Sequence, residues 1–186
     1  MQCLRLEHDT SKGHPLCRDC YLILEGTDSV ENRRKQFLKG DALKWGTVIN
    51  FAEGGNAENY KVAGWGSAEG TFTWTEGKTA SLNIPISVTN APFVILKAGL
   101  SAFLSPGKVD KQTVRILINN KAAGIWVFVK PELQEKSLFI PRDLLMKSND
   151  IEISFHIPDA VSPAQLGFNN DKRVLGLAIR TIELTE

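Results

Sequence analysis

The sequence predicts an all-β protein, an antiparallel sandwich of two sheets with jelly-roll-like connections. Three observations predict this class: short β-prone runs follow one another from about residue 45, turn residues separate them, and helical periodicity is weak throughout. About nine strands without a long helix are typical of two stacked sheets. The chain of 186 residues is long enough for one domain of ordinary size, which buries roughly 70% of its unfolded surface.

The first 44 residues differ in composition from the remainder. They contain all three cysteines and two of the three histidines, whereas the four tryptophans lie between Trp45 and Trp126. We therefore expect a partly irregular N-terminal extension over residues 1–44, with one strand at 21–25. The sandwich domain is expected over residues 45–186.

The expected strands are recognised by alternation of apolar and polar side chains. Residues 151–157 place apolar side chains at every odd position, as a half-buried strand requires. The other expected strands are 45–51, 71–75, 79–86, 93–103, 113–119, 124–129, 137–140 and 174–184. Residues 141–146 and 162–166 are each expected to form one helical turn, because Pro and Ser suit helix starts.

The last expected strand changes its apolar phase. Odd-numbered apolar positions from Leu175 to Ile179 give way to even-numbered Ile182 and Leu184. A β-bulge near Arg180 would keep both sets on the inner face. We therefore predict a bulge there.

Charge and hydropathy exclude several classes of protein. The 22 Lys and Arg residues against 21 Asp and Glu give a net charge of +1, which argues against a nucleic-acid-binding surface. The longest apolar runs fall far short of the ~20 residues of a membrane-spanning helix, and residues 1–20 contain no apolar signal-peptide core. The chain as written is expected to be soluble and cytoplasmic, without membrane insertion. The run Arg33, Arg34 and Lys35 is either a solvated face or a contact with an anionic surface.

The most distinctive segment of the chain runs from Gly64 to Thr75. It holds Trp65, Glu69 and Trp74, and a sugar site uses such residues: an aromatic ring stacks on the apolar face of a pyranose, while a carboxylate accepts hydrogen bonds from hydroxyl groups. The alternative is that the aromatic side chains fill the core of the sandwich. The sequence leaves both interpretations open.

The N-terminal cysteines suggest a zinc site with an incomplete ligand pattern. Cys17 and Cys20 have the spacing that lets two thiolates bind one ion, and His14 and Cys3 lie nearby in the sequence. The second half of the usual paired motif is absent, so the alternative is reduced thiols on an irregular extension. No cofactor is expected.

Acid–base chemistry would have to rest on carboxylates. His156 falls on the polar side of its strand and is expected to be exposed. Asp159, Asp171 and Glu69 could serve a glycoside hydrolase only if two of them lie about 5 to 9 Å apart. The sequence contains no paired acid motif, so this function ranks below binding.

The C-terminal half contains an ordered series of elements. Residues 139–141, 153–157, 158–167 and 171–177 follow one another, and residues 64–74 and 114–119 precede them. This series resembles a bacterial β-sandwich domain of unknown function that is attached to membrane glycosyltransferases and other envelope-glycan assembly proteins. The resemblance covers about residues 64–184. It implies an extracytoplasmic, jelly-roll, carbohydrate-binding-like module without known catalysis, whereas neither a membrane region nor an export signal is expected from the sequence as written.

The resemblance also implies a set of recurring residues. Three of them have a structural alternative: Asp171 and Arg173 would form an ion pair that holds the last loop, and Ser162 would cap the turn before Leu166. The recurring residues are Trp65, Glu69, Trp74, Asp159, Ser162, Pro163, Gly167, Asp171 and Arg173.

The function expected from the sequence is a non-catalytic carbohydrate-binding-like module or an accessory domain of glycan assembly. Its expected partner is a glycan. The alternative is a structural or protein-interaction sandwich, for instance a homodimer that pairs through a face or an edge strand. The expected ligand-binding residues are Trp65, Glu69, Trp74, Asp159, Asp171 and Arg173.

Overall fold

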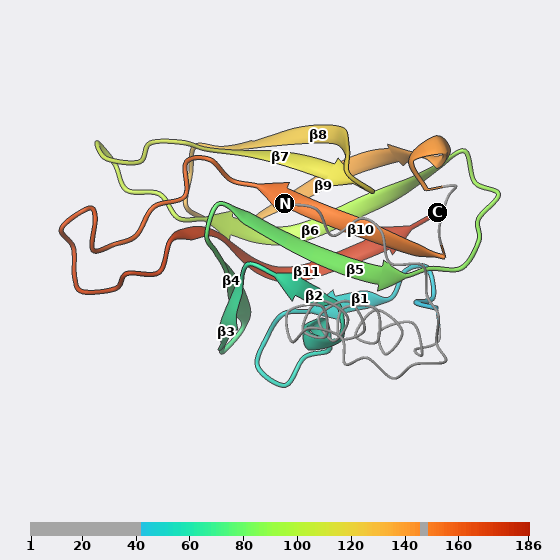
Figure 1. The fold of residues 1–186 in the computed structure, drawn as a ribbon, viewed down its shortest axis with the longest axis horizontal. Helices are drawn as coiled ribbons and strands as arrows, with labels where there is room; N and C mark the ends of the chain where they lie inside the picture. The colour runs from blue at the N-terminus through green and yellow to red at the C-terminus, as the bar shows by residue number, and fades with distance from the viewer. Residues whose placement is uncertain (1–41, 146–148) are drawn as a thin grey trace, which may run out of the picture. The chain divides into compact units, whose positions relative to one another are not determined.

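Two antiparallel sheets, stacked face to face, make up the part of the protein that the computed structural model describes, residues 42–145 and 149–186. The predicted all-β sandwich is confirmed (Figure 1). The helical structure in these residues consists of two short 3-10 turns, Ala57–Asn59 and Arg142–Leu144. The first of these turns was not predicted, and the second lies inside the predicted helical turn at 141–146.

The first sheet has six strands. Its order is β3 (Trp65–Glu69), β4 (Phe72–Glu76), β11 (Leu175–Thr185), β6 (Phe93–Ala102) and β9 (Gln134–Pro141). β1 (Val48–Asn50) pairs with the C-terminal half of β11, whereas β4 pairs with its N-terminal half. β11 is therefore the central strand of this sheet.

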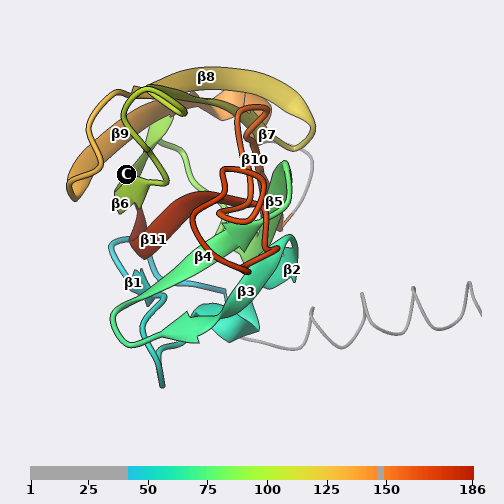
Figure 2. The same cartoon turned by 90° about the vertical axis from the view of Figure 1, so that its left-hand side faces the viewer.

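The second sheet has five strands. Its order is β2 (Lys61–Ala63), β5 (Thr79–Pro85), β10 (Asp150–His156), β7 (Gln112–Ile118) and β8 (Lys121–Phe128). The order β4-β11-β6-β9 facing β5-β10-β7-β8 is the strand order of a jelly roll. Figure 2 shows the two sheets along opposite sides of the core, with β8 and β9 next to each other at one edge.

The nine strands predicted within residues 45–186 all overlap observed strands, but β2 and β3 were not predicted. β2 is only three residues long, and β3 reads Trp-Gly-Ser-Ala-Glu, which does not alternate. The expected helical turn at 162–166 is a hydrogen-bonded turn instead. The expected strand at 21–25 lies outside the described residues.

The core lies between the sheets. Alternate side chains of the long strands point inward, and Leu96, Leu100, Ile116 and Ile153 are completely buried there. Leu43 is also buried, and its N–H donates to the carbonyl of Pro85 at 2.7 Å. Burial of so many branched side chains is the main stabilisation of the fold.

The predicted bulge in β11 is confirmed. The register with β6 shifts between Ile179 and Thr181, so Arg180 has no cross-strand partner on β6. Ile179, Ile182 and Leu184 all remain buried as a result. The bulge also leaves Arg180 exposed on the outer face.

Candidate functional site

Strand β4 presents its aromatic side chains on the outer face of the six-stranded sheet. Its inward positions are Thr73 and Thr75, which are completely buried. The hydroxyl of Thr73 donates to the carbonyl of Phe51 at 2.7 Å, and the Oγ1 of Thr75 accepts the N–H of Leu177 at 2.9 Å. These hydrogen bonds allow the two threonines to occupy the inward positions of β4. Trp74 therefore lies on the other face, outside the core, and is half-buried.

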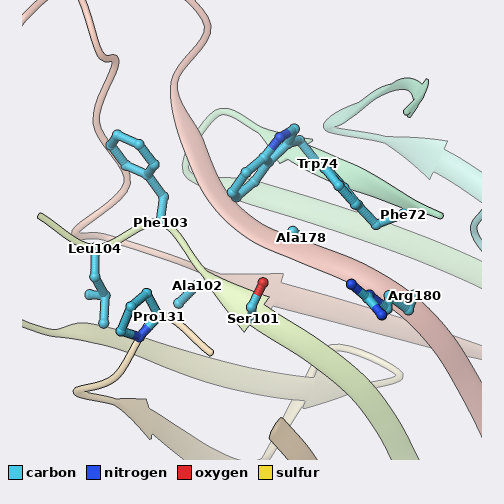
Figure 3. Close-up of a pocket in the computed structure, with 9 residues that line it drawn as sticks. All are labelled: Phe72, Trp74, Ser101, Ala102, Phe103, Leu104, Pro131, Ala178 and Arg180. Atoms are coloured by element: carbon cyan, nitrogen blue, oxygen red, sulfur yellow. The ribbon is translucent and has the colours of Figure 1, made fainter. Parts of the chain in front are cut away.

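Trp74 lines a shallow groove of about 330 Å³ on this outer face (Figure 3). Phe72 packs edge-on against Trp74 at a centroid distance of 5.6 Å, and Phe103 does so at 6.2 Å. The polar side chains of the groove are those of Ser101 and Arg180. In Figure 3, Arg180 lies on one side of Ser101, whereas Leu104 and Pro131 lie on the other.

Trp65 faces the opposite side of the same sheet. It pairs with Thr75, an inward position, and therefore points toward the interior. Its ring packs against Phe51 at 5.2 Å and against Phe155 at 6.5 Å, and its indole N–H donates to the carbonyl of Ser81 at 2.7 Å. The structure does not bring Trp65 and Trp74 together.

Three predicted site residues meet in one charged cluster. The guanidinium of Arg173 pairs with Glu69 at 2.5 Å and with Asp171 at 2.7 Å, and it lies 3.9 Å from Glu76. The side-chain and backbone hydrogen bonds from Arg173 hold the pKa of Asp171 below its ordinary value. The side-chain hydrogen bonds that Arg173 donates, first to Asp171 and then to Glu69, raise the pKa of Arg173.

The cluster ties the long loop after β10 to strands β3 and β4. Gly66 lies close to this cluster: a Cβ at that position would lie 2.4 Å from the Oε1 of Glu76, so the Glu76 side chain would have to move. The ion pair between Asp171 and Arg173 that the structural alternative predicts is formed. Glu69 and Asp171 are both engaged by Arg173.

Asp159 forms its hydrogen bonds with residues outside this cluster. Its carboxylate accepts the backbone N–H of Thr113 at 2.9 Å, and its carbonyl accepts the side-chain amide of Gln112 at 3.3 Å. The predicted cap at Ser162 is confirmed, since its Oγ accepts the N–H of Gln165 at 3.2 Å. The side chain of Gln165 in turn accepts the N–H of Ser162, which completes a capping box.

The other recurring residues of this loop also have structural surroundings. Pro163 is buried, and Gly167 adopts a positive φ of 74° in the turn that follows Ser162. Only glycine adopts such a φ at little cost. The loop after β10 and the loop between β6 and β7 project from the same end of the sandwich in Figure 1.

Sequence reasoning missed Ser101, Phe103 and Arg180 as groove residues. Phe103 was included in a predicted strand, but nothing in the sequence places it next to Trp74. The available signal was the predicted bulge, because a bulge redirects the side chains next to it.

The proposed zinc ligands Cys3, His14, Cys17 and Cys20 lie outside the described residues. Within residues 42–145 and 149–186, no group of three or more His, Cys, Asp and Glu side chains could hold a metal ion. The same residues contain no helix long and apolar enough to span a membrane. His156 is exposed, as predicted.

Comparisons with known proteins show a distant likeness of fold. No family model matches the chain, and no curated protein matches it in sequence. Solved structures of carbohydrate-binding modules share the β-sandwich.

Three of these structures illustrate the likeness. A family 36 carbohydrate-binding module in complex with calcium and xylotriose is 14% identical over 75% of this chain and 99% of its own, with a TM-score of 0.44. The CBM36-1 domain of a multidomain xylanase from the hindgut metagenome of Trinervitermes trinervoides is 9% identical over 75% and 96%, with a TM-score of 0.47. The C-terminal CBM6 of the laminarinase LamC from Zobellia galactanivorans is 11% identical over 75% and 98%, with a TM-score of 0.44.

Proposed function

We propose that this protein is a non-catalytic glycan-binding module whose sugar platform is the groove around Trp74. The half-buried indole, flanked by Phe72 and Phe103 on an open sheet face, is the observation that supports the proposal. Apolar grooves with a few polar groups are typical of small-molecule and sugar sites. Ser101 and Arg180 supply hydrogen-bonding groups for sugar hydroxyls.

This proposal revises the set of residues expected from the sequence. Trp74 remains the aromatic platform, whereas Trp65 is assigned to the core by its packing against Phe51 and Phe155. Glu69, Asp171 and Arg173 are assigned to holding the loop at the edge of the binding face. The carboxylates of Glu69 and Asp171 do not favour a hydrolase, because both already accept hydrogen bonds from Arg173.

The test is a glycan array followed by calorimetry with every sugar that binds. Trp74→Ala is expected to weaken binding at least about tenfold, because it removes the stacking surface. The matched control is Phe139→Ala, which removes an aromatic side chain that is 61% exposed elsewhere on the same sheet. If Trp74→Ala leaves every measured affinity unchanged, the platform is wrong.

A narrower proposal is that the module serves the assembly of envelope glycans. It is supported by the sequence resemblance over residues 64–184, and it predicts that envelope polysaccharides bind better than plant cell-wall sugars on the same array. Stronger binding to the plant sugars would contradict it.

A second candidate function, protein interaction, has one observation in its favour. Ile125 and Val127 on the outer face of β8, together with Val129 and Leu133, are exposed apolar side chains, with Ile125 exposed to 61%. A homodimer that covers this surface is a concrete form of this function. Light scattering across a concentration series tests it, and a monomer at the highest concentration would contradict it.

A further inference from the structure

The guanidinium of Arg180 lies in the groove, and none of the described residues is its acidic partner. Its side chain is exposed and lines the groove beside Trp74 and Ser101. The ion pairs found among the described residues are those of Arg173 and Lys61, so no described carboxylate pairs with Arg180. The residues that line the groove include no carboxylate either.

Arg173, the other arginine near this face, differs from Arg180 because carboxylates surround its guanidinium. Arg173 is surrounded by three carboxylates, those of Glu69, Asp171 and Glu76. Its charge is therefore compensated within the protein, whereas the charge of Arg180 is available to a ligand.

The backbone of β11 sets the direction of Arg180. The bulge gives Arg180 no cross-strand partner on β6, and the carbonyl of Arg180 accepts the N–H of Phe51 at 2.9 Å. This hydrogen bond anchors the bulge to the segment after β1, so the side chain starts from a fixed point on the outer face. Figure 3 shows the guanidinium on the side of the groove away from Pro131.

We propose that the groove takes an anionic glycan, a sugar chain that carries a carboxylate or a sulfate group. The guanidinium of Arg180 binds the anionic group while a sugar ring packs against Trp74. A planar guanidinium fork matches both carboxylate and sulfate oxygens, since each can accept two parallel N–H donors. This inference rests on the proposed glycan-binding function and specifies its ligand class.

The charged cluster at β3 and β4 predicts how an anionic ligand is oriented in the groove. Three carboxylates around one guanidinium leave an excess of negative charge on that side of Trp74. A ligand anion is repelled there and attracted at Arg180. The anionic group is therefore expected at the β11 side of the groove.

Calorimetry with matched sugars tests the ligand class. The first pair is tetragalacturonate and its methyl ester, which share a skeleton and differ in charge. The second pair is a sulfated carrageenan tetrasaccharide and its desulfated form. At least one anionic member is expected to bind about tenfold or more tightly than its neutral counterpart, and the pair that shows the difference identifies carboxylate or sulfate as the group.

Arg180→Gln is the decisive variant. It is expected to remove the preference for the anionic member, so that the affinities of the two members of a pair come within about twofold of each other, because the charge-assisted contact is lost. Arg180→Lys is expected to retain part of the preference through its point charge. Arg115→Gln removes an exposed arginine from the other sheet and is the control that should change nothing.

The outcomes separate this inference from the function on which it rests. Equal affinity for charged and neutral members, with Trp74→Ala still weakening both at least about tenfold, overturns the anionic ligand and keeps the glycan platform. An unchanged preference in Arg180→Gln also overturns it. If no sugar on the array or in either pair binds, the proposed function and this inference both fail.

Discussion

Two tryptophans only nine residues apart in the sequence have different physical roles. Trp65 packs between Phe51 and Phe155 and donates its N–H to Ser81, whereas Trp74 lies on the outer face. Trp65→Ala is expected to lower the free energy of unfolding by about 3 kcal/mol, because it leaves a cavity and an unpaired carbonyl. Urea denaturation followed by circular dichroism measures this change.

Trp74→Ala is the matched comparison, since it removes the same side chain from the surface. It is expected to cost about 1 kcal/mol, because the half-buried indole lies on the outer face of the sheet and does not pack against the core. A larger loss of stability in Trp74→Ala than in Trp65→Ala would contradict these assigned roles.

The ion pair of Asp171 and Arg173 makes stability depend on pH in the acid range. The pKa of Asp171 is lowered in the folded protein by hydrogen bonds from Arg173, so the unfolded chain binds its proton more readily. The stabilisation is therefore present above the unfolded pKa of about 4 and is lost as the pH falls through the lowered folded pKa. Asp171→Asn is expected to reduce the fall of the urea midpoint between about pH 5 and about pH 2.

A double-mutant cycle tests whether Arg173 is the group that lowers the pKa of Asp171. Arg173→Gln is expected to reduce the same acid dependence, and adding Asp171→Asn to it should change the dependence little further, because the two side chains act as one unit. Additive effects of the two substitutions would show that another group holds the pKa of Asp171 low.

At the scale of elements, alternation explains what the sequence could and could not predict. It located the nine strands expected within residues 45–186, and the change of phase in β11 located the bulge. It missed β3, because Gly66 and Ser67 interrupt the alternation of apolar and polar side chains. It also could not tell which face of β4 is inward, because buried Thr73 and Thr75 are satisfied by hydrogen bonds to segments distant in the sequence.

The junction of β2 and β3 depends on a glycine. Gly64 has a φ of 76°, and a Cβ there would lie 2.0 Å from the carbonyl oxygen of Thr79. Gly64→Ala is therefore expected to destabilise the protein by about 3 kcal/mol or more, since backbone atoms must move. Chemical denaturation of the purified variant measures the loss.

Gly70, in the turn between β3 and β4, is the matched control for this substitution. It also has a positive φ, of 54°, but an added Cβ would meet nothing within 4 Å. Gly70→Ala is expected to cost only about 1 kcal/mol, the cost of the left-handed conformation itself. Equal losses in the two variants would show that the approach of Gly64 to Thr79 does not matter.

At the scale of the whole domain, the site and the fold depend on the same long-range pairing. The groove joins Trp74 on β4 to Arg180 on β11 and Ser101 on β6. These residues are far apart in the sequence and meet only because β11 pairs with both β4 and β6. The sequence indicated Trp74 but could not supply its neighbours, since their adjacency is a property of the strand order.

The C-terminal end of β11 should therefore be essential to the folded domain. Removal of residues 182–186 deletes the buried side chains of Ile182 and Leu184 and the pairing with Ile49 on β1. Burial of two such side chains contributes about 3 to 6 kcal/mol, a large part of the 5 to 15 kcal/mol that stabilises a typical domain. The shortened protein is expected to lose its cooperative urea transition and its near-ultraviolet circular dichroism. Removal of Glu186 alone, which is exposed and follows β11, should leave both unchanged, and a normal transition after removal of residues 182–186 would show that the β1 pairing is dispensable.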